Sequence, residues 1–127
     1  MKKPKWAKLR RYKVVRVTIT KSGIPKPIYQ SVMVPVERAK HCSGKGKGII
    51  LTYRLGTVQT SPNGLCLNPN HTCGRGIHAW RTKAIAQYEV QYYFGSAILS
   101  VWAAKWVGTG RKQRAYRVWV GRVKCIF

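Results

Sequence analysis

Cysteine and histidine alternate in one short stretch of the chain, and both residue types bind zinc. The order Cys-x4-His-x-Cys-x4-His places Cys66, His71, Cys73 and His78 within 13 residues. The spacing differs from that of a CCHC knuckle or a C2H2 finger, and His71 and Cys73 could share one tetrahedral ion only from a tightly curled loop. We therefore expect no cofactor, and keep zinc bound by these four residues as the alternative.

The other reading of this stretch is small buried cysteines and hydrogen-bonded histidines. The sequence leaves open whether the four cysteines, Cys42, Cys66, Cys73 and Cys125, are free, bridged or metal-bound. Residues 1–6 lack the apolar stretch of a signal peptide, so we expect synthesis inside the cell. In a reducing compartment, thiols or metal ligands are favoured over disulfides.

The charge of the chain argues against an enzyme and for a polyanionic partner. Against 25 Lys and Arg there are only two acids, Glu37 and Glu89, which gives a formal net charge of +23. General acid–base pairs, catalytic triads and metal–carboxylate sites need carboxylates that this chain hardly has. We expect a non-enzymatic protein that takes no small-molecule substrate. Nucleic acid is the favoured partner, because cations that neutralise phosphates release counterions; an acidic protein surface is the other.

Residues 1–11 read as a basic N-terminal arm. The arm contains one tryptophan, Trp6, and six cations, Lys2, Lys3, Lys5, Lys8, Arg10 and Arg11. Cations can follow phosphates while a planar ring stacks on a base or sugar, so we predict that these residues bind nucleic acid. The alternative is a solvated, frayed terminus.

Two further segments carry candidate nucleic-acid contacts. In residues 43–48, Lys45 and Lys47 alternate with glycine, although the spacing is not that of a P-loop and a plain loop is the alternative. The second segment comprises Arg111 and Lys112, in the turn before the last expected strand, and Arg114, Tyr116 and Arg117 at the start of that strand. A sheet that presents aromatic rings between cations can bind single-stranded or irregular nucleic acid without reading its sequence.

The elements that must position these residues follow from periodicity and turn signals. We predict an α+β fold in one domain, residues 12–127, with about five or six mostly antiparallel strands and one helix over residues 82–94. Thr82 is the expected N-cap and Gly95 the stop. The strands are expected at 12–20, 28–36, 49–58, 76–81, 97–107 and 114–127. We expect Trp102, Trp106 and Trp119 to lie in the core.

The stretch Cys66-Leu67-Asn68-Pro69-Asn70-His71 resembles the Cys-x-Asn-Pro-x-His element of HNH endonucleases. That resemblance implies a metal-bound histidine in a ββα nuclease site. It covers six residues, the family's other features are not in their usual places, and two acids are few for holding a catalytic divalent metal. An HNH-like nuclease is therefore an alternative function.

A broader pattern resembles small uncharacterised domains of large DNA viruses and phages. It comprises Tyr-x-x-Gly at residues 53–56, Cys-Gly-x-Gly-Ile-His at residues 73–78 and a late strand containing Arg114 and Ala115. The resemblance implies a viral setting and no particular chemistry. We therefore expect a basic structural protein that binds RNA or DNA inside a larger assembly such as a virion, as an internal or minor capsid component.

The alternative setting is a ribosome-like particle, in which short basic proteins contact RNA. We expect no membrane partner, because the sequence has neither an apolar run near 18 residues nor a basic amphipathic helix with a broad apolar face.

Overall fold

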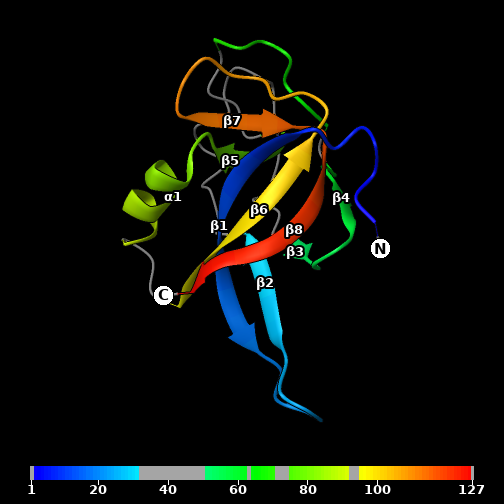
Figure 1. Cartoon of the computed structure of the whole chain (residues 1–127), viewed down its shortest axis with the longest axis vertical. Helices are drawn as coiled ribbons and strands as arrows, with labels where there is room; N and C mark the ends of the chain where they lie inside the picture. The colour runs from blue at the N-terminus through cyan, green and yellow to red at the C-terminus, as the bar shows by residue number, and fades with distance from the viewer. Residues whose placement is uncertain (1, 32–50, 63, 71–74, 92–94, 127) are drawn as a thin grey trace.

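The structure is a computed structural model that describes residues 2–31, 51–62, 64–70, 75–91 and 95–126. Within these residues the chain forms eight strands and one helix (Figure 1). In chain order the elements are β1 (Leu9–Ile19), β2 (Pro27–Ser31), β3 (Thr52–Tyr53), β4 (Val58–Thr60), β5 (Ile77–Trp80), α1 (Lys83–Val90), β6 (Ser96–Ala103), β7 (Lys112–Ala115) and β8 (Arg117–Ile126).

The predicted α+β class is wrong, because the described chain is a mostly antiparallel eight-stranded sheet with one short helix. The helix lies where the sequence predicts it but has only eight residues. It begins after Thr82, whose side chain accepts a hydrogen bond from the Ile85 N–H at 3.2 Å, as an N-cap does. The predicted range reached residue 94, and residues 92–94 lie outside the described part of the chain.

The extra strands are short ones that periodicity does not reveal. The single strand expected over residues 49–58 is instead two short strands, β3 and β4, separated by residues 54–57. Gly56 bends the chain there with a φ of 75°, a conformation that glycine adopts without strain. A strand of two or three residues is too short to show an alternating pattern, so the prediction undercounted strands.

The sheet curls until its two ends meet. The strand order is β3-β2-β1-β6-β8-β4, so its first and last members, β3 and β4, are neighbours in the sequence. The Gly56 N–H also donates to the Val120 carbonyl at 2.7 Å, which ties the bend to β8. A second short pair, β5 and β7, continues from β1 through the pairing of Tyr12 with Trp80. The curled sheet therefore has an enclosed inner face and an outer face.

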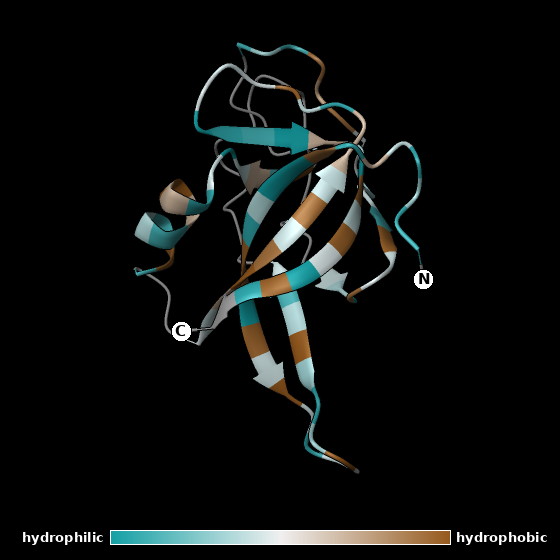
Figure 2. Ribbon diagram, in the orientation of Figure 1, coloured by the Kyte–Doolittle hydropathy of each residue, from teal (hydrophilic) through white to brown (hydrophobic). Residues whose placement is uncertain are grey.

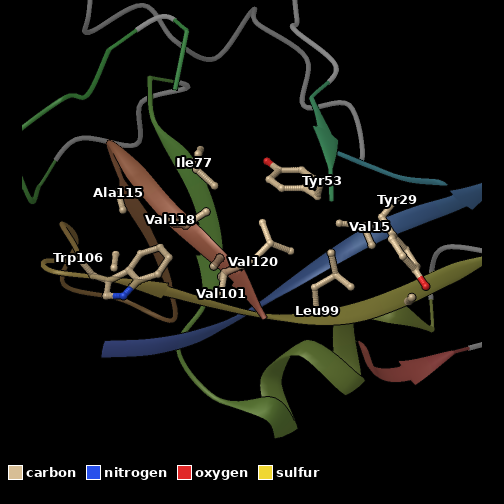
Figure 3. Packing of buried hydrophobic residues seen from close by; sticks show 13 residues of the cluster. Val15, Tyr29, Tyr53, Ile77, Leu99, Val101, Trp106, Ala115, Val118 and Val120 are labelled. Carbon is tan, nitrogen blue, oxygen red and sulfur yellow. The ribbon is translucent and has the colours of Figure 1, made fainter. Parts of the chain in front are cut away.

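The two faces bury different hydrophobic clusters. On the inner face, Val15, Leu99, Val101 and Val120 point toward one another and toward Tyr53 from β3 (Figure 3). On the outer face, a smaller cluster lies beneath α1 and consists of Val14, Ala86, Val90 and Ile98. The alternation of hydropathy along β1, β6 and β8 is visible in Figure 2. Adjacent residues of one strand thus face opposite sides, as the pleat requires.

Candidate nucleic-acid interface

A row of cations and aromatic rings crosses the outer face of the sheet. We name it the outer strip; its members are Trp119, Trp102, Arg10, Tyr12, Trp80 and Lys112. Trp119 of β8 pairs with Trp102 of β6, which pairs with Arg10 of β1. Two residues farther along β1, Tyr12 pairs with Trp80 of β5, which pairs with Lys112 of β7.

Register shows that the members of the outer strip share one side of the sheet. Residues directly opposite in an antiparallel pair have their side chains on the same face, and so do Arg10 and Tyr12, two apart in β1. The strip therefore runs over five strands, in the order β8, β6, β1, β5 and β7. At about 4.8 Å between neighbouring strands it is roughly 19 Å long.

Cations in and beside the outer strip lie over its rings. The Arg10 Cζ lies 5.4 Å from the centroid of the Trp102 ring and 5.5 Å from that of Tyr12. The Lys112 Nζ lies 5.6 Å from the centroid of the Trp80 ring. These distances allow cation–π attraction. Desolvation lowers the pKa of Lys112, and the negative charge of Glu89 opposes that shift. The rings are half-buried and the two cations are exposed, so the outer strip is accessible to a ligand.

The N-terminal segment lies against the same end of the sheet as Trp102. The Lys3 Nζ is 3.7 Å from the centroid of the Trp102 ring, and the Arg117 Cζ is 4.1 Å from that of Trp6. Ala7 is buried. Of the residues in the predicted arm, Arg10 and Arg11 belong to β1, which begins at Leu9. The described part of the predicted arm is therefore packed on the domain.

Two details adapt β8 to the outer strip. A side chain at Gly121 would meet the Ser100 hydroxyl and would come within 3.2 Å of the Trp102 indole nitrogen, so glycine allows Trp102 to pack closely on β8. The Trp119 indole N–H is buried and has no acceptor among the described residues. It is a hydrogen-bond donor at the end of the strip.

Lys13, on the inner face of β1, is a buried cation. Its side chain is 9% exposed, and its ammonium donates to the His78 carbonyl at 2.6 Å. The ammonium also lies 5.4 Å from the centroid of the Tyr53 ring. Burial, with a smaller contribution from the nearby charge of Lys112, lowers the pKa of Lys13 to about 7. The same burial raises the pKa of the Tyr53 hydroxyl above its usual range.

Arg114, a predicted nucleic-acid contact, is also buried, although it pairs with His78 and so lies on the same face of β7 as Lys112. It is 4% exposed, its Nε donates to the Cys66 carbonyl at 2.9 Å, and a second guanidinium nitrogen donates to the Asn68 carbonyl. The guanidinium therefore holds the loop that precedes β5. The structure places Arg114 outside the outer strip, in a structural position.

Three arginines gather at one end of the sheet. The Arg11 Nε donates to the Gln113 side-chain oxygen at 2.8 Å, and the Arg81 N–H donates to the Arg111 carbonyl at 2.8 Å. Partial burial, and then the charge of Arg81, lower the pKa of Arg11. The fold thus brings a cation of the predicted arm, Arg11, close to one of the predicted C-terminal patch, Arg111.

The remaining predicted contacts are scattered. Lys2, Lys5 and Lys8 are exposed and outside the outer strip, and Tyr116 is 50% exposed between β7 and β8. Lys45 and Lys47 lie outside the described residues.

Sequence reasoning missed the rings of the strip. Trp106 is a core residue, as expected, but Trp102 and Trp119 are half-buried on the outer face. Only the pairing of β1 with β6, and of β6 with β8, shows that these rings adjoin Arg10.

The zinc hypothesis stays a prediction. His71, Cys73 and Cys42 lie outside the described residues, as does the side chain of Cys125. Cys66 is half-buried, and His78 lies in β5. Within the described ranges no three His, Cys, Asp or Glu side chains are grouped as a metal site would require. In the HNH-like stretch, the Asn68 side chain accepts a hydrogen bond from the Asn70 N–H at 3.0 Å, which forms a local turn.

Comparison with known protein families, with characterised proteins and with solved structures finds no match for this chain. In the part of the chain that the structure describes, no helix has the length and apolar character needed to cross a membrane.

Proposed function

We propose that the protein is a non-enzymatic nucleic-acid-binding protein whose outer strip takes single-stranded or irregular nucleic acid. The observation that carries this proposal is the register of Trp102, Arg10, Tyr12 and Trp80, which sets rings and cations side by side on one face. Rings accept any base by stacking, and cations accept any phosphate, so the surface suits binding without sequence preference.

When a nucleic-acid strand binds the outer strip, base–ring and cation–phosphate contacts replace the cation–ring contacts. Without nucleic acid, Arg10 and Lys3 rest on the Trp102 ring. Exposed cation–π pairs stabilise by about 0.5–1 kcal/mol, whereas a base stacked on an aromatic side chain contributes about 1–3 kcal/mol. A strand can therefore displace the cations from the rings, stack its bases there and leave the cations to its phosphates.

The charge of the whole chain makes this exchange favourable. With 25 cations and two acids, the free protein repels itself, and a polyphosphate relieves the repulsion. The same excess suits a structural role in a larger nucleoprotein assembly. A virion is the setting that the sequence resemblance favours.

The experiment compares two variants of equal charge. Arg10→Gln with Lys112→Gln removes both cations of the outer strip, and Lys83→Gln with Lys105→Gln removes two exposed cations from α1 and from the loop after β6. The affinity for single-stranded and duplex DNA and RNA of unrelated sequence is measured across salt concentrations for the protein and both variants.

We expect the strip variant to bind single strands at least tenfold more weakly, and the control variant less than threefold more weakly. Equal losses in the two variants would show that net charge alone binds the strand. The absence of binding at low salt would refute the proposed function and point to an acidic protein partner.

A further inference from the structure

The hairpin formed by β1 and β2 projects from the end of the molecule farthest from β7 (Figure 1). Its two strands pair from Val15 with Ser31 out to Ile19 with Pro27. Residues 21–27 are all exposed, so the outer part of the hairpin packs on nothing else in the described chain. A two-stranded ribbon of this kind is as wide as the major groove of B-DNA, so only its narrow tip can enter the minor groove.

The tip of the hairpin is held in shape by Thr20. The Thr20 N–H donates to the Lys26 carbonyl at 3.0 Å, and the Thr20 hydroxyl oxygen accepts from the Lys26 N–H at 2.9 Å. Gly23 supplies the positive φ, 74°, at which the tip turns back. A pinned tip loses little conformational freedom on binding, which favours insertion into a partner.

Ile24, at the end of this tip, is the most exposed large apolar side chain described. It is 79% exposed and is followed by Pro25. Lys21 and Lys26 stand on either side, and the hairpin carries no acidic residue. The tip therefore combines an apolar point with flanking cations.

We propose that this tip is a wedge that enters the minor groove of duplex DNA and inserts Ile24 between neighbouring base pairs. Architectural proteins insert isoleucine, leucine or proline in this way, unstack one base step and bend the duplex by roughly 20–90°. Insertion removes the Ile24 side chain from water, while Lys21 and Lys26 reach the phosphates on the two sides of the groove.

Charge complementarity and groove shape select this partner. An apolar tip alone would suit a protein pocket, but two flanking lysines without an acid favour a polyanion. Duplex RNA has a deep, narrow major groove and a shallow minor groove, which fit a projecting ribbon less well than the grooves of B-DNA. This second surface goes beyond the proposed function and is separate from the outer strip.

The experiment measures bending of a duplex DNA labelled with a fluorescence donor and acceptor at its ends. The protein is compared with Ile24→Ser and with Leu67→Ser, a control that makes the same change at a 72%-exposed position on another loop. We expect the protein and the control to raise energy transfer on binding. Ile24→Ser should lose that rise and bind the duplex about tenfold more weakly.

Either of two results would overturn the wedge. One is saturated binding by the unaltered protein with no change in energy transfer, which would leave the tip to a protein partner. The other is full bending by Ile24→Ser. Affinity for single strands separates this proposal from the proposed function, since Ile24→Ser should leave it unchanged and the Arg10→Gln, Lys112→Gln variant should lower it.

Discussion

Cations on the two faces of β1 have different partners. Arg10, on the outer face, is exposed and lies over the rings of Tyr12 and Trp102. Lys13, three residues later on the inner face, is buried and donates to a backbone carbonyl. In a chain with two acids, these two positive side chains use neutral partners: Arg10 lies over two rings, and Lys13 donates to a carbonyl and lies near the Tyr53 ring.

This difference separates binding from stability. A ring–cation pair in contact with water can be exchanged for a base and a phosphate at small cost. A buried cation bonded to carbonyls cannot leave without exposing polar groups that then lack partners. The exposed cations are thus available to a ligand, and the buried ones hold the fold.

The largest effect is expected at Arg114. Arg114→Leu leaves the Cys66 and Asn68 carbonyls without their charged donor, so we expect the free energy of unfolding to fall by about 3 kcal/mol. Urea unfolding followed by circular dichroism measures the change. A loss below about 1 kcal/mol would show that this buried cation is dispensable and would contradict the difference between buried and exposed cations.

The next effect is the pH dependence of stability that Lys13 introduces. Its pKa falls from 10.5 to about 7 on folding, so between these values the unfolded chain binds more protons at this site. The resulting cost is complete below pH 7, shrinks as pH rises and is gone above pH 10.5. The folded state therefore gains stability from Lys13 deprotonation as the solution becomes alkaline.

Lys13→Met isolates this contribution from the titration of the other cations. The stability of the variant relative to the unaltered protein should fall by about 3 kcal/mol between about pH 6 and pH 9, as measured by urea unfolding at each pH. The lost hydrogen bond to His78 adds an offset that does not change with pH. A difference that stays constant across the range would mean that Lys13 keeps an ordinary pKa.

A smaller effect is expected at Gly121. Gly121→Ala places a methyl group against the Ser100 hydroxyl and the Trp102 ring, and we expect it to lower stability by about 1–2 kcal/mol. Because the ring must shift, single-strand affinity should fall as well. Measuring stability and single-strand affinity together tests whether the close packing of Trp102 on β8 is needed for binding. A variant that binds single strands with normal affinity would show that it is not.

The smallest effect on stability is expected at Arg10. Arg10→Gln removes two exposed cation–ring contacts and should change the free energy of unfolding by about 0.5 kcal/mol or less. Its effect should appear instead in a weaker, less salt-dependent affinity for single strands. If Arg10→Gln lowered the free energy of unfolding as much as Arg114→Leu does, Arg10 would be a cation that stabilises the fold, as the buried cations do.

The sequence predicted those parts of the fold that local patterns encode. The alternation of apolar and polar residues predicted most of β1, and Thr82 predicted the start of the helix. The closure of the sheet was not predictable, because β3 and β4 are too short for a periodic pattern and their pairing depends on distant strands.

The candidate site shows the same limit. Charge and aromatic content indicated a surface for nucleic acid, but neither tells which side chains share a face. Lys112 and Arg114 pair with Trp80 and His78 and so share one face of β7, yet Lys112 is exposed while Arg114 is buried and donates to the loop before β5. Register between distant strands and burial by a loop decide which residues join the strip, and one sequence contains neither.

The most direct measurement is ultraviolet crosslinking of the protein to a single-stranded nucleic acid, with mass spectrometry to locate the crosslinked residues. Tyr88 and Tyr116 are exposed aromatics outside the outer strip, at 58% and 50%, and serve as internal controls for random contact. The account predicts crosslinks at Tyr12, Trp80 and Trp102 in preference to these two more accessible rings. Crosslinks confined to Tyr88 and Tyr116 would contradict it.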